Sequence, residues 1–311
     1  MSRITTAINL IKHNRNEFIA SILTCFNFLF PDKLYLSLLY RLKMGHWIDW
    51  NNPKTFSEKL QWLKLNDRNP EYTNMVDKHT VKEYVAKIIG EEHIIPTLGV
   101  WNRLEDIDWD SLPDKFVLKT THGGGGSGVV ICKDKTTFDK NDAIAKLKKS
   151  LNECIYKTLR EWPYKNVDKK IIAEEYLSDF SEYNQGGLTD YKFYCFNGKA
   201  YKVMLCIDRD KNDTKFYSFD KEWNLLRHNK RGLAAPENFT LPKPHRMDEM
   251  FKIAEDLSKE LPFARVDLYF ANNQIYFSEI TFYPDSGLDS NILPYINKLY
   301  GSMIELSREV K

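Results

Sequence analysis

Four consecutive glycines stand between two apolar runs, shortly after a lysine, in the stretch FVLKTTHGGGGSGVVIC (residues 116–132). Glycines adopt positive φ angles and allow close backbone approach, so successive N–H groups in such a loop can converge on phosphate oxygens. Lys119 would direct a fixed cation at the same phosphates. Taken alone, the stretch indicates a phosphate-binding flap and an ordinary surface turn equally well.

Three familiar phosphate-binding motifs do not fit this stretch. A dinucleotide-binding GxGxxG is followed by a helix, whereas the residues after Gly128 are strand-like. A P-loop has lysine directly after its last glycine, where this chain has Val129. A protein kinase has its glycine loop before the lysine strand, and here Lys119 precedes the loop. Two interpretations remain, a mobile flap carried by two strands and an ordinary surface loop.

A second candidate site lies near the C-terminal end, in RVDLYFANNQIYFSEIT (265–281). A hairpin turning at 272–273 would place Asp267 and Glu279 roughly opposite each other, with Arg265 on the same face. Adjacent carboxylates repel one another, and Mg²⁺ prefers one or two carboxylates together with nucleotide phosphates. The hairpin therefore predicts a magnesium site, and its apolar neighbours weaken the alternative of a solvated acidic face.

The spacing of apolar residues predicts the elements that carry these motifs. Two helices are expected over residues 1–45, and a helix capped at Thr55 follows them. The next helices, strands and hairpins are expected over 77–90, 116–120, 129–132, 138–160, 170–177, 190–207, 214–226, 245–260 and 264–283, before a C-terminal helix. This order favours an α+β fold with mainly antiparallel sheets over repeated βαβ units.

The bulk composition narrows the functional classes. The formal net charge of +2 gives no general field for a polyanion, so no nucleic-acid partner is expected. Five cysteines without a CxxC pair argue against a disulfide framework or a zinc site and favour a reducing compartment. No secretory signal is evident, so a cytoplasmic location is expected.

One strongly apolar stretch, FIASILTCFNFLF (18–30), is flanked by basic residues. It is shorter than the roughly 20 residues that span a bilayer. A helix packed on the body of the protein is the favoured interpretation. The alternative is peripheral contact of the N-terminal helices with an anionic membrane surface, at the inner face of the membrane.

Taken together, the motifs over about 77–290 resemble the ATP-grasp superfamily. The fragments NPKTFSEKLQWLKL, TTHGGGGSG and SEITFYPDSGL are similar to its TupA-like branch, the teichuronopeptide-synthesis-like proteins of polysaccharide gene clusters. The resemblance implies an ATP-grasp fold, two α+β subdomains that clasp ATP. It also implies four segments: an N-terminal helical segment (1–50), a first part of the ligase unit (51–112), a lid subdomain with the flap (113–180) and a C-terminal subdomain with the metal site (181–311).

The resemblance also implies roles for individual residues. ATP phosphates would be held by Lys78, Lys119, Gly125, Gly126, Ser127 and Gly128. Adenine and ribose would be held by Glu174, Glu175, Tyr176, Leu177, Asp190 and Lys192, with Glu174 accepting from the adenine amino group. Mg²⁺ would be bound by Asp267, Glu279 and Thr281, the acylphosphate stabilised by Arg265 and the carboxylate substrate contacted by Ser286 and Gly287. Many relatives have asparagine where this chain has Thr281, which puts the second metal contact in doubt.

The function implied is an ATP-dependent carboxylate–amine ligase that works through an acylphosphate. Its substrates would be a glycan uronic-acid carboxylate and an amino acid or small amine. The best rival is a glycosyltransferase, because CIDRD (206–210) offers an Asp-x-Asp pair, Asp208 and Asp210, of the kind that binds a metal and a sugar nucleotide. A second rival is a non-catalytic scaffold, which the retained Lys119 and carboxylates argue against.

Overall fold

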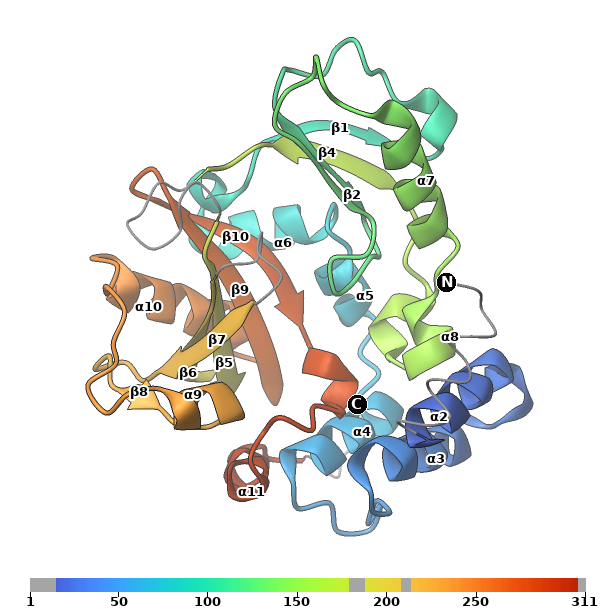
Figure 1. The fold of residues 1–311 in the computed structure, drawn as a ribbon, viewed down its shortest axis with the longest axis vertical. Helices are drawn as coiled ribbons and strands as arrows, with labels where there is room; N and C mark the ends of the chain where they lie inside the picture. The colour runs from blue at the N-terminus through green and yellow to red at the C-terminus, as the bar shows by residue number, and fades with distance from the viewer. Residues whose placement is uncertain (1–14, 179–187, 208–213, 307–311) are drawn as a thin grey trace.

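The computed structural model describes residues 15–178, 188–207 and 214–306, which form two antiparallel sheets surrounded by helices (Figure 1). Sheet A has the strand order β1-β4-β2-β3. Its strands are β1 (Thr97–Trp101), β2 (Phe116–Thr120), β3 (Val129–Cys132) and β4 (Ile171–Glu175). Helix α7 (Lys140–Leu151) buries Ala143 and Leu147 against this sheet. The flap is therefore the β2–β3 connection, as the sequence predicted.

Sheet B has the order β10-β9-β5-β6-β7-β8. Its strands are β5 (Asp190–Phe196), β6 (Lys199–Ile207), β7 (Lys215–Phe219), β8 (Leu225–Leu226), β9 (Phe263–Ala271) and β10 (Gln274–Thr281). Two hairpins turn at Asn197-Gly198 and Asn272-Asn273, where all four residues have positive φ. Such two-residue turns match the right-handed twist of the strands. Both predicted hairpins are confirmed.

Helices cover the sheets and fill the space between them (Figure 1). They are α2 (Arg15–Cys25), α3 (Asp32–Met44), α4 (Phe56–Asn66), α5 (Glu71–Val76), α6 (Val81–Ile89), α8 (Ile155–Leu159), α9 (Lys230–Ala234), α10 (Met247–Ser258) and α11 (Pro294–Met303). Short 3₁₀ turns are η1 (Asn27–Leu29), η2 (Glu91–His93), η3 (Leu104–Asp106), η4 (Trp162–Lys165) and η5 (Pro284–Gly287). The capping box predicted at Thr55 and Glu58 begins α4.

Two expectations about element limits need correction. The single helix expected over 138–160 is two helices, α7 and α8, because Cys154 has an extended backbone and begins a new helix. The division expected at residue 113 also cuts through sheet A, since β1 precedes it and pairs with β4. The helical segment expected before residue 50 is present as α2 and α3 within the described residues.

Candidate active site

Sheet A carries a buried cluster of cations around one carboxylate. Lys119 of β2 lies 2.5 Å from Oε2 of Glu174 on β4, and Lys82 of α6 lies 2.5 Å from Oε1. Burial disfavours the charged form of Lys119, but Glu174 outweighs it and raises the lysine pKa above its usual range. Burial likewise opposes ionisation of Glu174, yet Lys119 and Lys82 lower its pKa. All three side chains are therefore charged, with an excess of positive charge.

Lys78 connects this cluster to the flap and to sheet B. Its Nζ donates to the carbonyl oxygen of Gly123, at the start of the glycine run. Burial lowers the pKa of Lys78, and the carboxylate of Glu279 in sheet B partly offsets that effect. Lys78 therefore lies within electrostatic reach of both sheets.

The glycine run has the backbone freedom expected of a phosphate loop. Gly125, Gly126 and Gly128 have φ angles of 59°, 80° and 71°. Among the described residues, none accepts a hydrogen bond from the N–H groups of Gly125 and Gly126. Ser127 donates from Oγ to Oε2 of Glu153 at 2.6 Å, which places its hydroxyl beside the segment after α7. The two unpartnered N–H groups are the donors that a phosphate would meet.

Sheet B contributes a row of charged side chains that faces the lysines. Asp267 of β9 pairs in register with Lys192 of β5 on one side and with Glu279 of β10 on the other. Arg265 donates two hydrogen bonds of 2.7 Å to Asp267 and one of 2.9 Å to Glu279. The predicted juxtaposition of the two carboxylates is therefore present, with a guanidinium bridging them.

Lys192 joins a third carboxylate to the row. Its Nζ lies 2.6 Å from Asp190 and 2.5 Å from Asp267. Burial would raise the pKa of Glu279, but Lys78 and Arg265 lower it to about 2, so this carboxylate is ionised. Three carboxylates thus face two cations on sheet B, an excess of negative charge opposite the positive excess of sheet A.

The carboxylates of Asp267 and Glu279 could hold a divalent cation only if a bound nucleotide supplied further oxygen atoms. Asp267 and Glu279 already share one cationic group, Arg265. Glu279 is one third exposed, so its carboxylate is accessible. Within the described ranges, no three His, Cys, Asp or Glu side chains are grouped to hold a metal. Mg²⁺ accepts a coordination shell in which two carboxylates are joined by phosphate oxygens and water. Thr281 accepts from Arg265 at 3.1 Å and lies beside Glu279.

The order of these parts agrees with one family model, the TupA-like ATP-grasp family, which matches residues 58–305. The chain belongs to this family. No curated protein matches the sequence.

Several solved structures are similar in fold. The D-alanine–D-alanine ligase from Bacillus anthracis complexed with ATP has 16% identity and a TM-score of 0.42, covering 74% of this chain and 63% of that one. The L-amino acid ligase from Bacillus licheniformis has 12% identity and a TM-score of 0.44, with coverage of 78% and 51%. The biotin carboxylase domain of the Hydrogenobacter thermophilus 2-oxoglutarate carboxylase, in complex with MgADP, has 16% identity and a TM-score of 0.42, with coverage of 76% and 47%. The TupA-like chain thus spans about half to two thirds of these proteins.

The segment that would hold adenine in this TupA-like protein, residues 174–177, comprises the last two residues of β4 and the two that follow it. Both oxygens of Glu174 are paired with lysines, which is a different environment from the free acceptor expected for an adenine amino group. The N–H group of Glu175 donates to the carbonyl of Pro96 at 3.1 Å. Tyr176 is half-buried and Leu177 is buried. Their role toward adenine stays a prediction, and Asp208 and Asp210 of the rival hypothesis lie outside the described residues.

The two residues expected to contact the carboxylate substrate lie in η5, directly after β10. Asp285, Ser286 and Gly287 have consecutive positive φ angles of 45°, 56° and 67°. This backbone is strained for residues other than glycine, so surrounding contacts must hold it. Ser286 is buried against α4, where its carbonyl oxygen and hydroxyl both accept from Lys64.

Lys64 is the residue that the sequence interpretation missed here. It is fully buried, and Nζ donates to Ser286 O at 2.8 Å, Ser286 Oγ at 2.6 Å, Leu159 O at 3.0 Å and Gln61 Oε1 at 3.1 Å. Its spacing offered a signal, because Lys64 follows Leu60 by four residues and so shares its buried face. Lys64 ties the strained turn to α4 and to the end of α8.

Replacing Lys64 with methionine should destabilise the protein by about 3 kcal/mol, because several buried acceptors lose their donor while the side-chain volume is nearly kept. Urea unfolding followed by circular dichroism measures the change. The matched control is Lys54→Met, at an exposed position just before the same helix, which should stay near wild type. Equal stability of the two variants would show that Lys64 does not hold the turn.

Proposed function

We propose that this TupA-like ATP-grasp protein is an ATP-dependent ligase that joins a carboxylate to an amine. The observation that carries the proposal is the pair of oppositely charged rows. Lys119 of sheet A, the nearby Lys78 and an open glycine flap face two carboxylates of sheet B that share one guanidinium. Phosphoryl transfer needs mainly this kind of positioning and charge neutralisation, and little covalent chemistry from the protein.

Each group has a defined task in this proposal. Lys78, Lys119 and the free N–H groups of the flap bind ATP phosphates. Asp267 and Glu279 hold Mg²⁺, which would neutralise phosphate charge when bound. Arg265 donates to the anionic oxygens of the acylphosphate that forms when the carboxylate takes up the γ-phosphoryl group. Asp190 and Lys192 extend this row toward the expected ribose, and the segment 174–177 would line the adenine.

The substrates are inferred from the family. A TupA-like protein of polysaccharide biosynthesis would amidate the uronic-acid carboxylate of a bacterial surface glycan, such as a capsule, with an amino acid or small amine. The reaction would take place in the cytoplasm, where ATP is available.

The test is a set of parallel incubations. The protein is supplied with Mg²⁺-ATP, with glucuronate or galacturonate, and with amino acids or ethanolamine, and the release of ADP and phosphate is measured. Release that requires both a uronic acid and an amine supports the proposal. UDP release from UDP-sugars without ATP would contradict it, as would loss of activity in Asp208→Ala with full activity in Glu279→Ala.

We also propose that the N-terminal helices rest on an anionic membrane surface. Helices α2 and α3 pack on each other through Ala20, Tyr35 and Leu39. Other apolar side chains of this region are exposed, and they form what we call the N-terminal apolar patch: Ile19, Ile22, Phe26, Phe28, Leu29 and Leu34. Phe28 and Leu29 are 74% and 63% exposed. Large exposed apolar surfaces mark sites of interaction.

The charged residues around the N-terminal apolar patch favour contact with an anionic lipid surface. Exposed Arg15 and Lys33 flank the patch, whereas its two nearby acids are neutralised, Glu17 by Lys43 and Asp32 by arginines. Within the described residues, no helix is both long and apolar enough to cross a bilayer. Surface contact through apolar side chains, aided by basic ones, is how such helices bind anionic lipids.

Replacing Phe28 and Leu29 with serine should weaken binding to phosphatidylglycerol vesicles by at least about tenfold, because two apolar side chains no longer enter the interface. Co-sedimentation measures the change, with Leu233→Ser, an exposed position on α9, as the control. Wild-type protein that stays in solution with these vesicles would contradict the proposal. So would a change in mass by light scattering between wild type and variant, since it assigns the patch to a second copy.

A further inference from the structure

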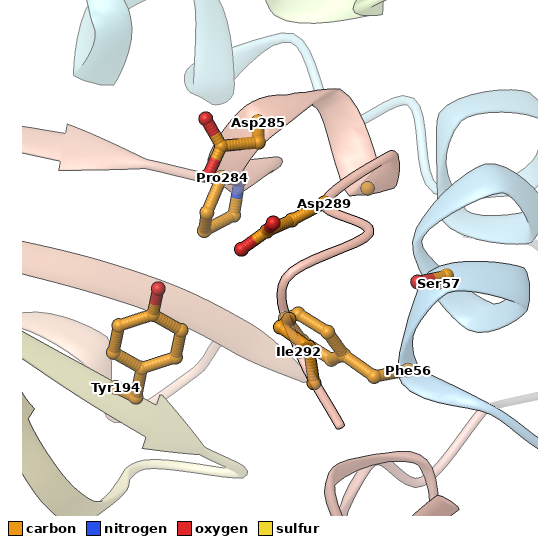
Figure 2. A pocket seen from close by; sticks show the side chains of 8 residues that line it. Phe56, Ser57, Tyr194, Pro284, Asp285, Asp289 and Ile292 are labelled. Carbon is orange, nitrogen blue, oxygen red and sulfur yellow. The ribbon is translucent and has the colours of Figure 1, made fainter. Parts of the chain in front are cut away.

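Polar side chains beside the proposed reaction centre on sheet B are occupied by one another. Figure 2 shows the small pocket between η5, β5 and the start of α4, with Tyr194, Asp285 and Asp289 around it. The space among its lining side chains is too small for a water molecule. Asp289 accepts from the N–H group of Asn291 at 2.8 Å, and Asp285 lies within electrostatic reach of Arg265. Spare hydrogen-bonding capacity is found instead on a lysine of sheet A.

Lys82 of α6 is a cation that the sequence motifs did not assign to the site. Its Nζ donates to the carbonyl oxygen of Ile95 at 2.7 Å and to Oγ1 of Thr97 at 2.8 Å, and it lies 2.5 Å from Oε1 of Glu174. Only 14% of the side chain is exposed. An ammonium group has three N–H donors, and these three acceptors occupy them. Lys82 therefore has no donor left for a ligand.

Lys119 has spare donors, although its side chain is as deeply buried as that of Lys82. Within the described ranges its one acceptor is Oε2 of Glu174, at 2.5 Å. Two of its three N–H donors therefore stay available. Burial lowers and Glu174 raises the pKa of both lysines, and Glu279 of sheet B also raises that of Lys119. Lys119 thus combines spare donors with a position near the proposed metal ligand.

The strand register explains why one carboxylate meets both lysines. Glu174 of β4 is the ladder partner of Thr97 on β1 and of Val117 on β2. Lys119 is two residues beyond Val117, so its side chain lies on the same face of sheet A. Helix α6 brings Lys82 to the β1 side of Glu174, where it also reaches Thr97. The carboxylate therefore lies between the two ammonium groups, with one oxygen for each.

We infer that Lys82 is a positioning residue for phosphate binding, an inference that rests on the proposed ATP-dependent function. By pairing with Oε1, Lys82 leaves Glu174 a single oxygen for Lys119. Without Lys82, both carboxylate oxygens would compete with the ATP phosphates for the N–H donors of Lys119. Charge-assisted hydrogen bonds to a carboxylate and to a phosphate are similar in strength, so this competition decides how many donors Lys119 keeps for the nucleotide.

Replacing Lys82 with methionine should weaken the binding of Mg²⁺ with inorganic triphosphate, or with a non-hydrolysable ATP analogue, by about 30-fold, the effect of one charge-assisted hydrogen bond. Adenosine, which has no phosphate, should bind as it does to wild type. Calorimetric titration measures the first two affinities, and saturation-transfer NMR measures the third. Lys87→Met, at an exposed position of the same helix, is the matched control and should leave all three unchanged. An equal loss of adenosine binding in Lys82→Met would overturn the inference, because Lys82 would then act through the adenine segment.

A double-mutant cycle with Glu174 separates the positioning role from a purely structural one. In Glu174→Gln the competing charge is gone, so adding Lys82→Met should lower triphosphate affinity by less than about threefold. Glu174→Gln alone should bind triphosphate more tightly than wild type, which gives a second readout if Lys82→Met does not fold. The same 30-fold loss in both backgrounds, or weaker triphosphate binding in Glu174→Gln, would overturn the inference. Urea unfolding checks that each variant is folded.

The ligase proposal fails by a different result. Wild type that binds the ATP analogue but forms no amide from a uronic acid and an amine would contradict the ligase function, and the cycle would still decide the role of Lys82. Wild type that binds neither the analogue nor triphosphate would overturn both proposals.

Discussion

Replacing Lys119 with methionine should weaken ATP binding by about 100-fold, the effect of losing charge-assisted hydrogen bonds to phosphate. The fold should survive, for a reason visible in the ion pairs. Glu174 contacts Lys82 as well as Lys119, so the variant does not leave a buried carboxylate without a cation. Removing one partner of a simple buried pair would cost about 3–5 kcal/mol, and here that cost is avoided.

Calorimetric titration with Mg²⁺ and a non-hydrolysable ATP analogue measures the affinity, and urea unfolding measures the stability. Lys115→Met is the matched control, since Lys115 is exposed just before the same strand. It should bind the analogue like wild type. Unchanged affinity in Lys119→Met would remove this lysine from the phosphate site, and a large loss of stability would make Lys119 a structural cation.

The sequence predicted the features that depend on local geometry. Asn197-Gly198 and Asn272-Asn273 specify two-residue turns, and a turn fixes the register of the strands on either side. An uninterrupted ladder from the second turn would pair Asp267 with Ser278, one residue short of Glu279. A β-bulge between Phe277 and Glu279 shifts the register and brings Glu279 opposite Asp267, so this pairing is only approximately predictable from the turn. The capping box at Thr55 is equally local. These elements could be predicted because the residues that decide them are within a few positions of each other.

Contacts between distant segments could not be predicted in this way. Lys64 of α4, which holds the η5 turn, is 222 residues from Ser286 in the sequence. A lysine is rarely fully buried, because its charge loses hydration. Here four well-placed acceptors and the nearby carboxylate of Glu161 offset part of that loss. Glu174 is a similar case. Its motif indicated an adenine contact, whereas in the structure Lys82 of α6, 92 positions earlier in the sequence, pairs with the same carboxylate as Lys119.

The helix break at 152–154 has another cause. Apolar spacing carries a helical pattern across the break, but the chain must turn there so that α8 can meet η4 and the N-terminal helices. Tyr35 donates from its hydroxyl to the carbonyl of Thr158 at 2.7 Å, which fixes α8 against α3. Tertiary packing therefore overrides a continuous local pattern.

If Glu279 binds Mg²⁺ as we propose, replacing it with glutamine should lower the turnover of ATP by about 1,000-fold, because the metal that would stabilise transition-state charge by several kcal/mol loses one anionic ligand. The substitution keeps the shape of the side chain. Its amide oxygen can still accept from Arg265 and from Thr281, which now contact Oε1 of Glu279. Stability should therefore stay close to wild type.

Asp267→Asn makes the informative comparison. Asp267 is almost completely buried and accepts from both Arg265 and Lys192, so its loss leaves two cations with a weaker partner. This variant should lose activity and also about 3 kcal/mol of stability, as expected when a buried ion-pair network is broken. Glu83→Gln, at an exposed position of α6, should change neither quantity.

Magnesium dependence decides between a metal ligand and a residue that only orients Arg265. If Glu279 binds the metal, the Mg²⁺ concentration for half-maximal ATP turnover rises in Glu279→Gln, and excess Mg²⁺ restores part of the rate. If Glu279 acts only through Arg265, the dependence on Mg²⁺ stays that of wild type while the maximal rate falls. The second outcome would move the metal to Asp267 and its neighbours, because the glutamine still bridges to the guanidinium and the rest of the row is unchanged.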